Sequence, residues 1–222
     1  MTMSGAVRNI LDRNGKAILD LRNLGSVSKE ALTALIKAVS TRREQPPGLW
    51  VLLLGEDKLP GAAAPERFQP LSDLIQTLIE TAVPAAAVVR GLVSGESLIL
   101  LLFSIFSAAG REVSVRLPGS VRDTAEVAAS FLLSLKLGPG AAERLQNGPL
   151  TLNGFSALEA GILSVMDEDP EAGLDRWRQT SPLADGSREA RLLYQGMRWR
   201  FHAAFRTGLV ELEDLVGPKG EG

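Results

Sequence analysis

Two acidic stretches of the sequence could supply general acid/base groups. Glu96 comes directly before the apolar run that begins at Leu98. Burial beside that run would raise the pKa of Glu96 toward neutrality, as a general base requires. In the alternative interpretation, Glu96 points to solvent or pairs with Arg90. The second stretch, Asp123 to Glu126, has the spacing of a capping box, in which the two ends of a first helical turn satisfy each other's N–H groups.

A serine nucleophile is a further possibility, because Ser94 and Ser97 lie beside Gly95. A serine hydrolase of the usual kind needs a histidine as general base. His202 is the only histidine, and it falls in a segment that predicts a C-terminal helix, so a Ser–His dyad is not expected. Without cysteine the chain can have neither a thiol nucleophile nor a Cys-based zinc site, and no metal site is predicted.

Composition places the chain among ordinary globular proteins. Its 222 residues suffice for one domain with a full core. Its 24 basic and 26 acidic residues nearly balance, so the net charge does not favour binding to nucleic acid or to anionic membranes. The first residues lack the basic and apolar segments of a signal peptide. The most apolar stretch, Leu98 to Phe106, is too short to span a bilayer. We therefore expect a cytoplasmic protein without nucleic-acid or membrane partners.

The elements that position these residues alternate between strands and helices. Strands are predicted from short apolar runs, and helices from apolar residues that recur at helical spacing. The predicted order is a strand at Lys16–Leu21, a helix capped by Ser28, a strand at Leu49–Leu54, a helix at Leu71–Ala82 and a strand at Ala85–Gly91. This order favours an α/β fold of right-handed βαβ units with a mostly parallel sheet.

The second half of the chain is predicted to be richer in helix. The segment from Ser94 to Gly110 is predicted to be one buried helix that opens directly from the third strand. A fourth strand is predicted at Glu112–Leu117, and mostly helix follows from Asp123 onward. Because no interdomain linker is recognisable, we expect a single domain over residues 1–222, with its core at about 16–166 and a helical C-terminal region at about 167–216.

The last part of this helical region mixes basic and aromatic residues. Its apolar residues nevertheless recur at helical spacing, at Leu193, Met197, Phe201 and Phe205. Such a stripe indicates a packing helix rather than a surface for nucleic acid.

Three segments, in this order and spacing, resemble the crotonase superfamily of the enoyl-CoA hydratase/isomerase type. Residues 83–102, VPAAAVVRGLVSGESLILLL, are similar to the family's strand, Gly-rich turn and buried helix. Residues 115–120 and 136–145 resemble its Leu-Pro-Glu block and a later helix, and residues 147–165 its Pro-Leu-Ser and Gly-Leu-Val run. The resemblance implies a spiral of ββα units of the ClpP/crotonase kind, whose C-terminal helices pack at a trimer interface.

The resemblance also implies how a ligand would bind. In the family an acyl-CoA thioester places its carbonyl oxygen against two backbone N–H groups, which form an oxyanion hole. One of them aligns with Gly61 or Ala62, and the other with the turn at Gly95 and Glu96. The two glutamates that activate water in hydratases align with Ile99 and Gly119, and neither residue can transfer a proton.

Other positions keep two interpretations open. Glu126 aligns with an acid that some isomerases and an aryl-CoA dehalogenase of the family use, and the same residue would complete the capping box. Glu96 stands where the family has glycine. In the family the thioester becomes an enolate, and the negative charge of a carboxylate at this position would destabilise it. Arg22 and Lys29 fall in the region that reaches the CoA phosphates, and solvated surface is the equal alternative.

These features lead to one expectation and two alternatives. We expect an acyl-CoA-binding protein with weak or no hydratase activity, an accessory or pseudoenzyme subunit without a further cofactor. It would form a homotrimer or a dimer of trimers, or a hetero-oligomer with an active paralogue. The first alternative is an active isomerase or dehydratase of an unusual CoA thioester that uses Glu126 or Glu96 as acid/base. The second is a structural trimer with a filled pocket.

Overall fold

The computed structural model of the chain describes residues 11–13, 16–22, 24, 27–56, 65–119, 124–184, 187, 192 and 194. Within them a six-stranded sheet has the order β1-β2-β3-β4-β6-β9, and a smaller sheet has the order β5-β7-β8. The strands of the larger sheet are β1 (Leu11–Arg13), β2 (Lys16–Asp20), β3 (Leu49–Gly55), β4 (Ala85–Arg90), β6 (Phe106–Ala109) and β9 (Val165–Met166). Those of the smaller sheet are β5 (Leu92–Val93), β7 (Ser114–Arg116) and β8 (Thr151–Asn153).

The larger sheet is parallel from β2 to β9, as the strand–helix alternation predicted, and only β1 runs antiparallel to its neighbour β2. Its central strands β3 and β4 are continuous apolar runs because both of their faces are covered. Trp50 and Leu52 point into the main core on one face, whereas Leu49 and Val51 point into a smaller core on the other. This alternation shows that the sheet lies between two helical layers.

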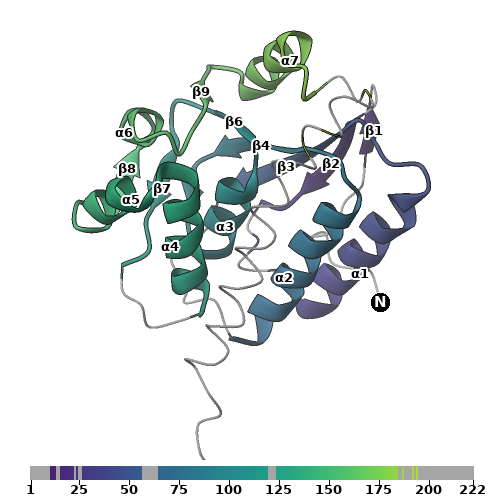
Figure 1. The fold of residues 1–222 in the computed structure, drawn as a ribbon, viewed down its shortest axis with the longest axis horizontal. Helices are drawn as coiled ribbons and strands as arrows, with labels where there is room; N and C mark the ends of the chain where they lie inside the picture. The colour runs from purple at the N-terminus through teal and green to yellow at the C-terminus, as the bar shows by residue number, and fades with distance from the viewer. Residues whose placement is uncertain are drawn as a thin grey trace, which may run out of the picture.

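Figure 1 shows these layers: α1, α2 and α3 lie on one side of the larger sheet, and α7 lies on the other. The helices are α1 (Lys29–Ser40), α2 (Pro65–Glu80), α3 (Gly95–Phe103), α4 (Thr124–Leu137), α5 (Pro139–Gln146), α6 (Gly154–Glu159) and α7 (Pro170–Thr180). A short 3₁₀ turn, Thr41–Arg43, follows α1.

The start of α1 follows its sequence signal, whereas the start of α2 does not. Ser28 caps α1 as predicted, because its hydroxyl accepts a hydrogen bond from the Ala31 N–H at 3.2 Å. The end of α2 is tied to the sheet by the indole N–H of Trp50, which donates to the Thr81 hydroxyl at 2.9 Å. The predicted start of α2 at Leu71 was wrong, since the helix begins at Pro65 and runs through the buried Pro70. Pro70 is the sixth residue of this helix, where a proline removes one intrahelical hydrogen bond.

The buried helix predicted from Ser94 to Gly110 is two elements. Every residue of α3 from Glu96 to Phe103 is buried, which confirms a helix that is covered on all sides. The helix ends at Ser104, whose backbone is extended, and β6 then pairs in parallel with β4. The prediction of helix over Phe106–Ala109 was wrong because a continuous apolar run fits a buried strand as well as a buried helix.

Helix α7 covers the second face of the sheet. Leu174 is buried there, and the indole of Trp177 stacks on Phe106 with ring centroids 4.6 Å apart. Lys16 at the start of β2 forms an ion pair with Asp175, and Arg90 at the end of β4 forms one with Glu171. Apolar packing and these ion pairs together hold α7 across the strands.

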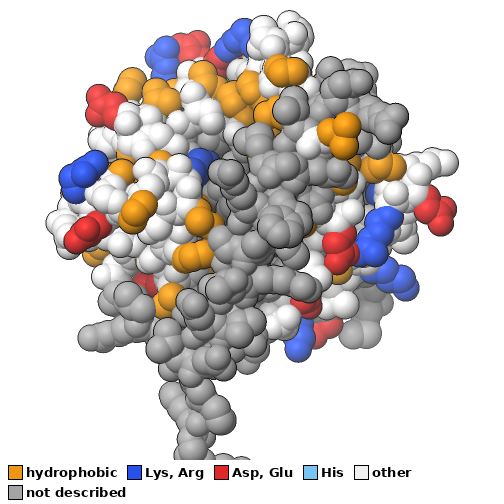
Figure 2. All heavy atoms as spheres, viewed as in Figure 1, with side chains coloured by type: hydrophobic (Ala, Val, Ile, Leu, Met, Phe, Trp, Pro, Cys, Tyr) orange, Lys and Arg blue, Asp and Glu red, His pale blue; other side chains and the backbone are white. Residues whose placement is uncertain are grey.

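On the face drawn in Figure 2, acidic and basic side chains of the described residues are interspersed, and neither sign gathers in one area. Among the described helices none has the length and apolarity needed to cross a membrane.

Candidate functional site

The carboxyl ends of β3 and β4 adopt a backbone that few residues tolerate. Three residues there have positive φ, Gly55 at 106°, Glu56 at 59° and Gly91 at 62°, and so does Gly95, at 48°, the first residue of α3. Glycine adopts such values readily, but Glu56 pays a conformational cost. Backbone strain of this kind concentrates at functional sites, because the surrounding structure must enforce it. In open α/β sheets the carboxyl ends of the strands are also where ligands bind.

The two strand ends touch each other through their backbones. The Glu56 N–H donates to the carbonyl oxygen of Arg90 at 3.1 Å. A Cβ atom built on Gly55 would lie only 1.8 Å from that same oxygen, so glycine alone fits. The chain after β4 is then turned by Gly91 and leads through β5 into α3.

The first turn of α3 presents backbone N–H groups at this edge. The Ser94 carbonyl accepts hydrogen bonds from the N–H groups of Ser97 at 3.1 Å and Leu98 at 3.3 Å. The N–H groups of Gly95 and Glu96 come before the first donor used within the helix. Such a helix start carries a partial positive charge, which favours a carbonyl oxygen or an anion.

The acidic side chain in this turn is buried. Glu96 is 5% exposed, so the interpretation in which it points to solvent was wrong. Arg90, the other suggested partner, forms ion pairs with Glu171 and with Asp169, the latter at 3.9 Å. Ser97 is buried as well, at 1% exposure. The turn therefore combines backbone donors with a buried carboxyl group.

Ile99 and Gly119, which the resemblance aligns with the two hydratase glutamates, carry no ionisable group. Ile99 is fully buried within the main core. Gly119 is exposed beyond the end of β7, and a Cβ there would lie 3.4 Å from Cδ1 of Leu150. An apolar side chain therefore borders each position.

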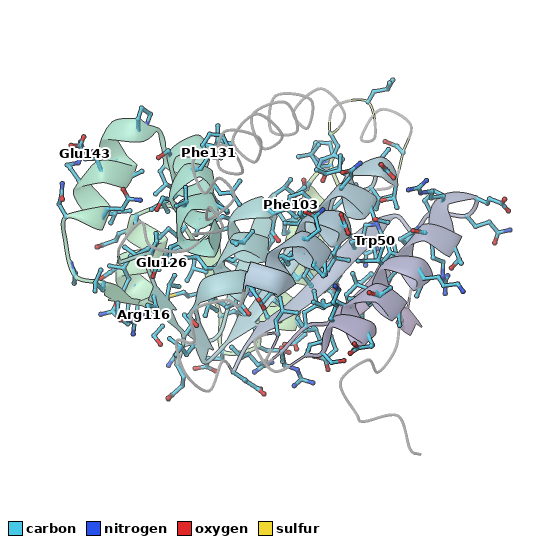
Figure 3. All side chains as sticks on the ribbon, turned by 90° about the horizontal axis from the view of Figure 1, so that it is seen from below. Trp50, Phe103, Arg116, Glu126, Phe131 and Glu143 are labelled. Atoms are coloured by element: carbon cyan, nitrogen blue, oxygen red, sulfur yellow. The ribbon has the colours of Figure 1, made fainter. Side chains whose placement is uncertain are left out.

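Glu126 lies in the first turn of α4 and is half-buried. Figure 3 shows it on the α4–α5 side of the molecule, with Phe131 and Glu143 and away from Trp50. Helix α4 shares the main core with α3, so Glu126 is on an element that packs against the candidate site. Its proposed capping partner, Asp123, lies outside the described residues, and the capping box stays a prediction.

Several other predicted residues also lie outside the described part of the chain. These are Gly61 and Ala62, which would supply the second N–H group, His202, and the apolar stripe at Leu193, Met197, Phe201 and Phe205.

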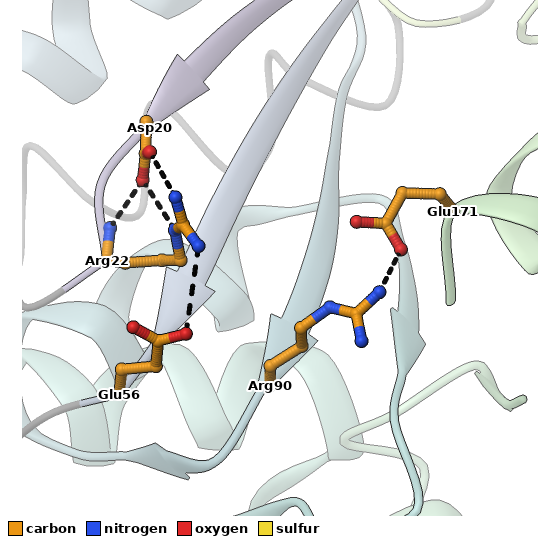
Figure 4. Close-up of polar contacts among 5 residues, drawn as sticks. All are labelled: Asp20, Arg22, Glu56, Arg90 and Glu171. Carbon is orange, nitrogen blue, oxygen red and sulfur yellow. Dashed lines mark hydrogen bonds and ion pairs between the residues drawn. The ribbon is translucent and has the colours of Figure 1, made fainter. Parts of the chain in front are cut away.

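Arg22, the predicted phosphate-binding residue, takes part in a network of ion pairs (Figure 4). Its guanidinium donates to both carboxylate oxygens of Asp20, at 2.9 and 2.6 Å, and lies 3.7 Å from Glu56. Arg22 lowers the pKa of Asp20, and Asp20 raises the pKa of Arg22. Lys29, the first residue of α1, is exposed. Binding of phosphate by either residue stays a prediction.

Lys136 on α4 is held at the opposite end of α3. Its ammonium donates to the carbonyl oxygens of Leu101 at 3.4 Å and Ser104 at 3.3 Å, and the Leu101 oxygen also accepts from the Ser104 N–H at 3.2 Å. Burial lowers the pKa of Lys136 from 10.5 to about 8. In the described part of the chain no three His, Cys, Asp or Glu side chains are grouped closely enough to hold a metal ion.

Two features of the site were not predicted from the sequence. The contact between Gly55 and Arg90 depends on which strands are neighbours, and a glycine directly after an apolar run was its only signal. The ion pair between Arg90 and Glu171 joins residues far apart in the chain and leaves no local pattern.

No protein-family model matches the chain, and no curated protein is similar enough in sequence to match. Solved structures do match over most of its length. ThnE from S. clavuligerus has a TM-score of 0.70 and 16% identity, covering 91% of this chain and 98% of its own. A monofunctional enoyl-CoA isomerase from M. smegmatis has a TM-score of 0.65 and 17% identity, covering 88% and 92%. An enoyl-CoA hydratase from Mycobacterium avium has a TM-score of 0.64 and 20% identity, covering 90% and 80%.

At these identities the likeness establishes the fold. The chain has the crotonase fold, as the order of its elements and its short motifs predicted. Function must be argued from the residues of the site, because one fold supports different activities.

Proposed function

We propose that the chain binds an acyl-CoA thioester at the carboxyl ends of β3 and β4, and that it has weak or no hydratase activity. One observation supports this most directly. The strand, turn and helix from β4 to α3 are intact, whereas Ile99 and Gly119 stand where a hydratase of this fold would need glutamates.

The binding half of the proposal rests on the first turn of α3. Its N–H groups and the helix dipole would stabilise the thioester carbonyl oxygen, with the second N–H group supplied from Gly61 or Ala62. Arg22 and Lys29 are the candidates for contact with the CoA phosphates.

The catalytic half rests on what hydration requires. Water must be deprotonated and a proton must reach the substrate carbon, so that at least one acid/base group has to touch the reacting atoms. An isoleucine and a glycine provide none. We therefore assign the chain an accessory or pseudoenzyme role in the cytoplasm. In this proposal it acts as a homotrimer, as a dimer of trimers, or in a hetero-oligomer with an active paralogue. In this proposal residues 1–222 act as one domain and need no further cofactor.

A second candidate function is isomerisation or dehydration of an unusual CoA thioester. It is favoured by the burial of Glu96, 5% exposed, in the turn that would hold the carbonyl. A buried carboxyl group can serve as an acid or base near neutral pH. Glu126 is the other candidate group.

Calorimetry with crotonyl-CoA and longer acyl-CoAs tests the binding, and assays of hydration and double-bond isomerisation test the chemistry. The variants are Glu96→Gln and Glu126→Gln, and the control is Glu143→Gln, which changes an exposed glutamate on α5. Binding without turnover supports the accessory role. Turnover that Glu96→Gln or Glu126→Gln abolishes, and Glu143→Gln does not, supports the isomerase. If no thioester binds, both proposals fail and a structural trimer is left.

A further inference from the structure

The contact between Gly55 and Arg90 lies directly upstream of the turn that leads to α3. Arg90 is the last residue of β4, and its carbonyl oxygen is in contact with the end of β3. The Glu56 N–H donates to that oxygen at 3.1 Å, and Gly55 provides the space for it. We refer to this arrangement of Gly55, Glu56 and Arg90 as the backbone clasp.

Between the clasp and α3 the chain is fixed again. The Gly91 carbonyl accepts a hydrogen bond from the Ser114 N–H at 3.0 Å, and β5 then pairs with β7. Val93 is fully buried immediately before the Ser94 cap. The connection from Arg90 to the start of α3 is therefore short and is hydrogen-bonded at both ends, to β3 through Arg90 and to β7 through Gly91 and β5.

We propose that Gly55 is a positioning residue for carbonyl recognition. Its missing side chain lets β3 and β4 approach closely enough for the clasp to form, and the clasp sets the direction in which the first-turn N–H groups of α3 face a thioester oxygen. This inference rests on the proposed binding of acyl-CoA. It assigns Gly55 no contact with the ligand.

A glycine on the other side of β4 provides a matched control. Gly110 follows β6, and its N–H donates to the Val89 carbonyl at 3.0 Å, much as Glu56 does to Arg90. A Cβ on Gly110 would lie 3.9 Å from the Val89 oxygen, an ordinary contact, and Gly110 has no positive φ. Alanine is therefore expected to fit at Gly110 but to displace Arg90 at Gly55.

The test compares butyryl-CoA with S-butyl-CoA, a thioether that has a methylene in place of the carbonyl. The nucleotide and acyl-chain contacts are common to both ligands, so the ratio of their affinities reports carbonyl recognition alone. For the wild type we expect the thioester to bind about tenfold more tightly, as one good hydrogen bond contributes. Gly55→Ala should lower this ratio to less than about threefold while thioether affinity stays similar, and Gly110→Ala should keep it.

Gly91 supplies a second pair of variants should Gly55→Ala not fold, as judged by circular dichroism and melting. A Cβ on Gly91 would lie 3.5 Å from the Glu56 nitrogen, so space is available and only the φ of 62° is unfavourable. Asparagine tolerates this φ better than alanine. Gly91→Ala should lower the affinity ratio, and Gly91→Asn should restore most of it.

The outcomes separate the two levels of the proposal. If the wild type binds neither ligand, the proposed function is wrong and this inference falls with it. If the wild type prefers the thioester and a folded Gly55→Ala protein keeps the full preference, the binding stands and the positioning role of Gly55 is overturned. An unchanged ratio in both Gly91 variants would overturn it in the same way.

Discussion

Glu96 and Ile99 lie one turn apart on α3, and both side chains are buried, with 5% and 0% exposure. An acidic residue is thus in the first turn of the helix, and an aliphatic side chain one turn later is in the core. The resemblance to hydratases implies the reverse, a glycine at the first position and a glutamate at the second. This relationship is the basis of the proposal that binding has been kept without hydration.

The first prediction concerns restoring the missing carboxylates. Ile99→Glu should destabilise the protein by about 3 kcal/mol or more, because a carboxyl group would replace an aliphatic one inside a closed core. Gly119→Glu should change the free energy of unfolding by less than about 1 kcal/mol, since surface substitutions have small effects. Chemical denaturation of both variants measures this.

Ile99→Val is the control for Ile99→Glu, and it should cost about 1 kcal/mol through loss of one methylene. A folded Ile99→Glu protein of wild-type stability would mean that the position is accessible to water or to a ligand. In that case Ile99 would not lie in a closed core.

The second prediction concerns the charge of Glu96. If the thioester oxygen lies at the start of α3 and Glu96 is ionised there, Glu96→Gln should raise acyl-CoA affinity roughly threefold to tenfold, because a negative charge near a partly negative oxygen is removed. Titration calorimetry with butyryl-CoA checks this, with Glu143→Gln as the control on an exposed position. A loss of turnover without any gain in affinity would instead identify Glu96 as a working acid or base.

The third prediction concerns acid stability at the ends of β2 and β3. Because Arg22 lowers the pKa of Asp20 in the folded state, ionised Asp20 stabilises the fold above its unfolded pKa. Asp20→Asn should cost about 1 kcal/mol near pH 7, and the difference from wild type should vanish as the pH falls below about 4.

Urea denaturation at several pH values measures that difference. The exposed pair of Arg111 and Glu168 provides the comparison, because both side chains are at least 70% exposed. Glu168→Gln should leave stability unchanged at every pH. A difference for Asp20→Asn that persists in acid would show that the ion pair with Arg22 is not its cause.

The fourth prediction concerns Lys136 at the C-terminal end of α3. Burial lowers its pKa from 10.5 to about 8, so between these values the unfolded chain binds more protons than the folded one. Stability should therefore rise with pH across this range. Relative to Lys136→Met, the wild type should gain on the order of 2 kcal/mol between about pH 8 and 10.

Lys37→Met is the control for this experiment, because Lys37 is exposed in the last turn of α1. The difference in free energy of unfolding between Lys37→Met and the wild type should not change with pH over the same range. If the Lys136→Met difference is equally flat, the ammonium is more hydrated than its contacts with Leu101 and Ser104 indicate.

Most of the fold could be predicted from the sequence, because helix starts and buried strands give local signals. Ser28 predicted the start of α1, and the apolar run at Leu49–Leu54 predicted a central parallel strand, since each depends on adjacent residues. The strand at Phe106–Ala109 was missed, because in a largely buried segment the apolar pattern has no period.

The site was less predictable because it depends on which distant segments meet. The alignment of Gly95 and Glu96 with the start of a buried helix was correct, but the burial of Glu96 could not be known without its neighbours. The approach of the Arg90 carbonyl to Gly55 is set by the register of β3 against β4, which no short pattern encodes.

The most direct test of the central claim is titration calorimetry of the wild-type protein with crotonyl-CoA, with the recovered ligand examined by mass spectrometry. We predict saturable binding and recovery of crotonyl-CoA without addition of water. Absence of binding would contradict the claim that the site holds a thioester, and recovery of the hydrated product would contradict the claim that hydration has been lost.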